Sequence, residues 1–338
     1  MKKLLSIFLM AATVMSVKAV SLEELNLKSR LHYGQQFTEG ERMPDLSGFS
    51  LDYVFFDLSA NLCDGLTFTY NQNLSNLYDY GFWGSLEQLK LNYDINDNWS
   101  ISAGKMFNLM GGWEMDKEDI DHYAVSEFWD NSEIFTPGIE VDYNFNNETD
   151  ALCLQVTQSP LLGDYTWGRD LMGYNLMWYG EHDWFQTAYS FNVYGYDKAK
   201  YENLITLGNR FDFEDFVLEL DITSRADMED YSLFKSFSIV ADAKYNFEYL
   251  TLGLKYSFDY NDNVNDMYIM PGTSIHYATA QAEYKPFKNY QDLRLYAAVT
   301  TSFGKYDVEN SEVIYEPKTI RAMVGLNWNV DFLNMFNK

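Results

Sequence analysis

"YLTLGLKYSFDY", residues 249–260, alternates residue by residue between two kinds of side chain. One parity holds only large apolar or aromatic residues: Leu250, Leu252, Leu254, Tyr256, Phe258 and Tyr260. Successive side chains of a β-strand point to opposite faces of the sheet, so a period of two predicts a strand with one apolar face. From Thr251 on, the other parity holds small, polar or charged residues, which predicts a polar opposite face.

The same alternation recurs along the chain, for example in "ELNLKSRLHYGQQF" (24–37) and "TIRAMVGLNWNVDF" (319–332). It predicts strands at 24–37, 48–60, 65–74, 85–94, 98–106, 137–146, 150–158, 172–181, 183–195, 202–213, 215–224, 234–247, 249–260, 275–286, 291–303 and 318–332. These are sixteen strands, and an even number is typical of a closed bacterial outer-membrane barrel.

The connections between these strands alternate in length. Short ones are predicted at 95–98, 146–149, 181–183, 213–215 and 247–249, and long ones at 38–47, 159–171, 261–274 and 304–317. Tight turns at one end and longer loops at the other are typical of a transmembrane β-barrel. In hydrocarbon the sheet must close, with the apolar parity toward lipid. About sixteen strands leave an aqueous channel lined by the polar parity.

The first residues predict export. Lys2 and Lys3 precede an apolar run that ends near Ala19, which is typical of a secretory signal peptide over residues 1–19. We therefore expect the barrel to occupy residues 20–338. Aromatic residues make up 17% of the chain, and no other apolar run is long enough for a spanning helix. This composition predicts an outer-membrane barrel.

Charge and residue types exclude several functions. The formal net charge is −26, and without the predicted signal peptide it is −29, from 21 basic and 50 acidic residues, so nucleic acid is not an expected partner. Cys63 and Cys153 do not make a disulfide framework. The four histidines lack metal-ligand spacing, and no nucleophile–base constellation is visible. We expect no cofactor, no metal site and no enzyme activity.

Residues 108–135, called here the acidic segment, break the alternation and form the third long loop. Lys117 is the only Lys or Arg in this segment. Its carboxylates are Glu114, Asp116, Glu118, Asp119, Asp121, Glu127, Asp130 and Glu133. Loops of this length are usually functional or disordered, and aromatic residues such as Trp113 and Trp129 need a surface to pack on. We expect the segment to fold into the barrel and narrow it. The alternative is a solvated surface loop.

Basic residues on the lumen parity are Lys28, Arg30, Lys90, Arg294 and Arg321. Barrel closure makes the first and the last strands neighbours, which predicts one basic patch of Lys28, Arg30, Arg294 and Arg321 opposite the acidic segment. Such a pair of surfaces sets up a transverse field across the pore. Alternatively, the arginines pair with wall carboxylates such as Asp52 or Asp331. Acidic lumen candidates are Glu140, Asp142, Glu219, Asp221 and Glu283.

Four motifs resemble the phosphate-selective porin O and P family. They are "ISAGKMF" (101–107), "GGWEMD" (111–116), "PGIEVDYNF" (137–145) and "LCLQVTQSP" (152–160), and the resemblance runs from the second strand through "GYNLMWYG" (173–180). It implies a sixteen-stranded, usually trimeric channel. The family's phosphate-selective members line the pore with many basic side chains. This chain departs from that pattern, with seven Arg and an acidic loop.

The expected function is an outer-membrane porin for passive diffusion of small hydrophilic solutes and ions. Eight loop carboxylates exceed the four cations of the wall patch, which predicts a mild cation preference. The expected partners are these solutes, the surrounding outer-membrane lipid and two further copies in a homotrimer. Two alternatives stay open: a phosphate- or anion-selective porin, and a barrel adhesin or receptor that acts through its outer loops.

Overall fold

The computed structural model describes residues 20–146, 149–162, 171–227, 232–288, 290–308 and 312–336. The predicted signal peptide, residues 1–19, lies outside these described residues. The barrel strands are β1 (Ser21–Thr38), β3 (Gly48–Cys63), β4 (Leu66–Asn73), β5 (Leu86–Asp94), β6 (Trp99–Phe107), β7 (Phe135–Phe145), β8 (Asp150–Gln158), β9 (Met172–His182), β10 (Phe185–Asp197), β11 (Lys200–Phe213), β12 (Phe216–Asp227), β13 (Ser236–Asn246), β14 (Leu250–Asn261), β15 (Thr273–Tyr284), β16 (Leu293–Val308) and β17 (Glu312–Asp331).

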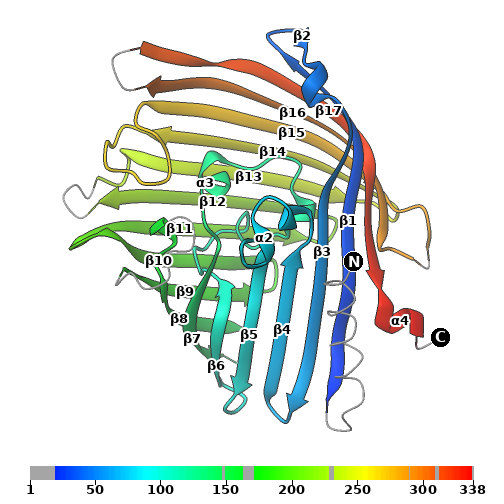
Figure 1. Cartoon of the computed structure of the whole chain (residues 1–338), viewed down its shortest axis with the longest axis vertical. Helices are drawn as coiled ribbons and strands as arrows, with labels where there is room; N and C mark the ends of the chain where they lie inside the picture. The colour runs from blue at the N-terminus through cyan, green and yellow to red at the C-terminus, as the bar shows by residue number, and fades with distance from the viewer. Residues whose placement is uncertain are drawn as a thin grey trace.

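Each of the sixteen predicted strands is present, and the sheet closes. The first strand, β1, pairs antiparallel with β17 from Asn26 opposite Asp331 to Thr38 opposite Thr319, and with β3 on its other side. Figure 1 shows the blue β1 beside the red β17 at this seam. Within the described residues, closure pairs both edges of the sheet, as a hydrocarbon environment demands. The predicted all-β, sixteen-stranded antiparallel barrel is confirmed.

Short elements occupy the connections. They are β2 (Glu41–Arg42), η1 (Pro44–Leu46), η2 (Ser75–Leu77), α2 (Gly81–Gly84), η3 (Asp119–Asp121), α3 (Glu127–Asp130), η4 (Pro160–Leu162) and α4 (Phe332–Phe336). Among the described residues, no helix has the length and apolar character needed to cross a membrane. Cys63 is exposed, Cys153 is buried, and both are free thiols.

The two faces of the strands follow the predicted parity. On β14, Leu252, Leu254 and Tyr256 are 43%, 66% and 42% exposed, whereas Ser257 and Asp259 on the other parity are buried. Apolar side chains outside and polar side chains inside reverse the arrangement of a soluble protein. Lipid, rather than water, is the solvent that this outer face suits.

The barrel has a turn end, where β5–β6, β7–β8, β9–β10, β11–β12 and β13–β14 join tightly, and a loop end with most of the long connections. The prediction of a long loop at 304–317 is wrong. Strand pairing between β16 and β17 continues from Gly304 opposite Glu316 to Val308 opposite Glu312. Backbone pairing requires no apolar parity once a hairpin extends beyond the hydrocarbon layer, so the alternation ends before the strands do.

A hydrophobic cluster lies among lumen-parity side chains. Met110, Met115 and Phe128 of the acidic segment pack against Tyr194 on β10 and Leu204 on β11. Tyr268 and Ile269, from the connection between β14 and β15 (residues 262–272, the 262–272 connection), complete the cluster. Both connections therefore bury apolar side chains against the same group of strands.

Candidate functional site in the barrel lumen

The acidic segment approaches the wall through two glycines. Gly111 and Gly112 have φ of 71° and 82°, a region that side chains disfavour. The Gly112 N–H donates to the Ala188 carbonyl of β10 at 3.0 Å. A Cβ on Gly111 would lie 2.7 Å from the Ser190 Oγ, and one on Gly112 would lie 3.2 Å from the Asp221 carboxylate. Only glycine lets the main chain lie this close to β10 and β12.

Two wall carboxylates hold the backbone of the segment. Asp221 on β12 accepts the N–H groups of Trp113 and Glu114 at 2.9 and 2.7 Å. Asp259 on β14 accepts the N–H groups of Glu127 and Phe128, at 3.0 and 3.3 Å, at the start of α3. Free N–H groups at a helix start favour a negative partner. An acidic segment is thus stably bound to an acidic wall.

Two lysines neutralise further carboxylates on this side. Lys117 contacts Glu219 on β12 and lies 2.6 Å from Asp242 on β13. Burial lowers the pKa of Lys117, but Asp242 and Glu219 outweigh burial and hold the pKa above its ordinary value. Lys255 on β14 lies 2.7 Å from Glu114 and donates to the Ala124 carbonyl at 2.8 Å. Lys255 is not among the predicted pore-lining residues, although the alternation in 249–260 places it on the lumen parity.

The predicted basic patch contacts the acidic segment at the seam. Lys28 on β1 lies 3.0 Å from Asp57 on β3 and 2.6 Å from Glu118. Arg30 donates to the Ile120 carbonyl at 3.2 Å and to the His122 carbonyl. Two of the four patch cations therefore bind this segment directly from β1.

Arg30 also has wall partners. It lies 3.3 Å from Asp52, and its guanidinium is 4.3 Å from the centre of the Tyr53 ring. The alternative pairing with Asp52 is thus realised, but Asp331 instead accepts from Asn334 at 2.5 Å.

The other predicted cations differ in their contacts. Arg294 on β16 lies 2.6 Å from Asp121 and 3.0 Å from Glu283. The Arg321 guanidinium, on β17, lies 2.9 Å from His32 Nε2 rather than against the acidic segment. Lys90 is on β5, away from the seam, and interacts electrostatically with Glu140 on β7. Lys28, Arg30, Arg294 and Arg321 lie on three neighbouring strands as predicted, whereas Lys90 lines a different part of the wall.

The remaining carboxylates of the segment are less neutralised. Burial raises the pKa of Asp119 to about 6, with Arg30 opposing and Glu118 adding to the shift. Burial and the nearby Glu219 raise the pKa of Asp116. Burial and the adjacent Glu127 likewise raise the pKa of Asp130. These groups keep protons more readily than ordinary aspartates.

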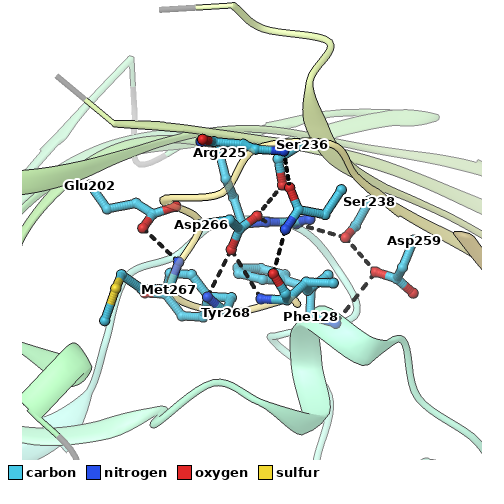
Figure 2. A network of polar contacts seen from close by, with 12 residues as sticks. Phe128, Glu202, Arg225, Ser236, Ser238, Asp259, Asp266, Met267 and Tyr268 are labelled. Carbon is cyan, nitrogen blue, oxygen red and sulfur yellow. Dashed lines mark hydrogen bonds and ion pairs between the residues drawn. The ribbon is translucent and has the colours of Figure 1, made fainter. Parts of the chain in front are cut away.

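The contacts at the loop end include a buried ion pair that is not among the predicted site residues (Figure 2). Arg225 on β12 lies 2.9 Å from Asp266 of the 262–272 connection, and both side chains are 0% exposed. Asp266 also accepts the N–H groups of Tyr268 and Ile269, at 2.7 and 3.0 Å. The Arg225 guanidinium lies 5.1 Å from the ring centre of Phe128 in α3. The ring centres of Phe128 and Tyr268 lie 5.1 Å apart, so the 262–272 connection packs on the acidic segment.

Two cavities border the acidic segment. The wall cavity, about 330 Å³, lies between the segment and β3–β7, with Asn71, Glu87, Gln88, Lys90, Asp116, Asp119 and Glu140 in its lining. The turn-end cavity, about 560 Å³, is lined by Glu24, Lys244, Glu283, Lys285, Asp292 and Arg294, among others. Lys28, Glu118 and Ile120 line both. Such charged, water-accessible space suits small polar solutes. Within the described residues, no group of His, Cys, Asp and Glu is arranged to hold a metal ion.

The comparisons with solved structures match porins. An anion-selective porin from Comamonas acidovorans aligns with a TM-score of 0.65 at 12% identity, over 92% of this chain and 100% of that chain. The outer-membrane channel DcaP of Acinetobacter baumannii aligns with a TM-score of 0.62 at 11% identity, over 93% and 99%. OmpF of Salmonella typhi, solved with daunomycin, gives 0.59 at 13% identity, over 92% and 97%. These identities show a shared fold.

Sequence comparison identifies the family. No curated protein sequence matches the chain. The family profile of phosphate-selective porin O and P matches residues 25–328, from β1 to β17. That family and this fold belong to channels rather than enzymes. The chain therefore belongs to the phosphate-selective porin O and P family and is an outer-membrane β-barrel porin.

Proposed function

We propose that this porin passes small hydrophilic solutes with a mild preference for cations, and that the acidic segment folds into the lumen and narrows it. One observation carries the proposal: the segment bonds to strands on both sides of the ring. Gly112 bonds to β10, whereas Glu118 pairs with Lys28 on β1. A loop that bonds to opposite walls of a closed barrel is expected to cross its interior.

The cation preference rests on unbalanced charge in the wall cavity. Glu87, Asp116, Asp119 and Glu140 line it and form no ion pair within the described part of the chain. Among the cations that line this cavity, Lys90 alone forms no ion pair within the described residues. An excess of unpaired carboxylates attracts cations and repels anions within a Debye length of about 8 Å at physiological salt.

An anion-selective channel is the second candidate, favoured by the turn-end cavity. Lys28, Lys244, Lys285 and Arg294 line that cavity. The family carries a phosphate-selective description, and the Comamonas acidovorans neighbour is named anion-selective. A receptor role through the outer loops stays a prediction.

Single-channel recording across a salt gradient separates the two candidates. For the purified protein in a planar bilayer, we expect a reversal potential of the sign given by cation preference. Replacing Arg30, Arg294 and Arg321 together by neutral residues should strengthen that preference, because wall cations are removed. A wild-type channel that strongly prefers phosphate or chloride would refute the cation proposal.

We also propose a homotrimer whose loop end faces outward. The outer face of β13–β15 carries Ala241, Ala243, Ala278 and Ala280 along one groove, and small residues let protomers approach closely. One OmpT structure of Vibrio cholerae, aligned with a TM-score of 0.53 at 11% identity over 93% and 100% of the chains, is named a trimer form. Cross-linking in native membranes should trap three copies. Only monomer would contradict this.

A further inference from the structure

We infer that solutes cross this barrel along the β3–β7 wall, and that Lys28, facing Glu118, is the residue that determines passage at the narrowest point. The inference rests on the proposed channel function but adds a location and a residue to it. The sequence predicts a basic patch that faces the acidic segment across the pore, but direct contacts bridge the two surfaces. Arg30 and Arg294 already bind the acidic segment.

The lumen beside β10–β14, called here the filled half, holds protein instead of water. Its lumen-facing polar side chains are almost completely buried: Ser190, Asn192, Thr206, Thr223, Ser238, Ser257 and Asp259. Polar residues on a barrel's inner face are exposed when the lumen is wet. Here Met110, Phe128 and Tyr268 of the two connections lie in the hydrophobic cluster beside them. The Arg225–Asp266 pair lies in the same region (Figure 2).

The lumen beside β3–β7, called here the open half, is less completely filled, although Asp57, Gln72 and Ser102 are buried there too. Asn71, Glu87, Gln88 and Lys90 are only half-buried, and they line the wall cavity. Glu87 and Gln88 lie near the start of β5 at the loop end, whereas the other cavity is lined from the turn end. The two cavities together extend along the barrel axis from one end toward the other.

The two cavities meet at Lys28, Glu118 and Ile120, which line both. The side chains of Lys28, Asp57 and Glu118 are 14%, 6% and 56% exposed. An ion pair with so exposed a partner competes with water and contributes little stability. Lys28 keeps its pair with the buried Asp57 on the wall when it separates from Glu118. The contact with Glu118 is thus the part that a passing solute displaces.

The chemistry of this route favours small solutes with a positive group. Glu87, Asp119 and Glu140 lie along the wall cavity, and Glu118 is exposed at the junction. A cation that enters can replace the Lys28 ammonium on Glu118. An anion that enters from the loop end meets Lys28 only after it has passed the carboxylates of the wall cavity. Lys28 therefore sets both the free width of the junction and its charge.

Charge-matched variants test the junction in planar bilayers. Lys28→Met should raise conductance by roughly twofold and increase cation preference, because it removes a positive charge and breaks the ionic contact with Glu118 that closes the junction. Lys285→Met removes the same charge from the wider turn-end cavity and should change both quantities far less. Equal effects of the two substitutions, or no effect of Lys28→Met, would overturn the assignment.

Thiol block tests the route independently of charge. In a Cys63→Ser, Cys153→Ser background, Gln88→Cys and Asn71→Cys should let a bulky water-soluble methanethiosulfonate reduce conductance by about half or more. Ser238→Cys in the filled half should not react. Block only at Ser238, or at none of these positions, would show that solutes pass elsewhere. A protein that forms no channel at all would instead refute the proposed function.

Discussion

The two halves of the lumen come from strands with the same alternation but differ in what covers their polar face. In the filled half, Asn192 and Thr206 are 0% and 1% exposed. In the open half, Glu87 and Lys90 face a cavity. Asp221 and Asp259 lie in the filled half, where they accept backbone N–H groups of the acidic segment. Strand pattern thus decides the barrel, but a few docking side chains decide where water remains.

Removing the acidic segment should have the largest effect on the difference between the filled half and the open half. Deletion of Met115 to Trp129 takes away Phe128 and the charged junction, so the filled half should become wet. We expect single-channel conductance to rise by roughly twofold or more, since about sixteen strands enclose an aqueous channel. Cation preference should fall with the loss of the segment's carboxylates. Unchanged conductance would place the segment outside the pore.

Breaking the buried Arg225–Asp266 ion pair should destabilise the filled half. Arg225→Met leaves Asp266 buried without its cation, which costs about 3–5 kcal/mol of folding free energy. The folded barrel should lose its fast gel mobility at a lower temperature. Arg210→Met on β11 is the matched control, because that side chain is 31% exposed and its partners lie at 3.4 and 3.6 Å. The control should cost about 1 kcal/mol or less. Equal losses of folding free energy in the two variants would show that the Arg225–Asp266 pair has no special role.

A smaller effect is expected from the lysine that neutralises Glu114. Lys255→Met removes a partner at 2.7 Å, but Glu114 still accepts from Ser126, so the cost should be about 1–3 kcal/mol. Hydrogen exchange should show faster exchange of the Glu127 and Phe128 amides. Lys255→Arg keeps the charge and should retain protection. Unaltered exchange in Lys255→Met would show that Asp221 and Asp259 alone hold the segment.

The smallest effect should come from pH, and it should fall on the open half. The pKa of Asp119 is raised to about 6, so this carboxylate is charged at pH 7.5 and protonated near pH 5. Acidification therefore removes one negative charge from the wall cavity, and cation preference should decrease modestly. Asp119→Asn should remove that part of the pH dependence. A cation preference that rises on acidification would contradict this sign.

The sequence predicted the strands well because lipid imposes a strict period of two on each of them. It also marked the acidic segment, since "GGWEMD" interrupts that period. It failed at 304–317, where paired strands extend without an apolar parity. Lys255 could have been predicted as a lumen residue, because its parity alone places it there.

Other contacts had no signal in the sequence. The pairing of Arg225 with Asp266 joins residues 41 positions apart, through a connection whose path depends on packing. Equally, parity does not tell which seam cations bind the segment. Lys28, Arg30 and Arg294 do, but Arg321 contacts His32.

Asp221 and Asp259 hold the acidic segment through main-chain N–H groups, which every residue except proline supplies. The side chains of Trp113, Glu114, Glu127 and Phe128 do not make these four bonds. Exposed positions of the segment, such as Glu118, are therefore free to mutate during evolution without losing the attachment. A lineage that meets new nutrients can exchange the charges at its pore while it keeps the same scaffold. In such a barrel, ion selectivity can change more readily during evolution than the path of the loop.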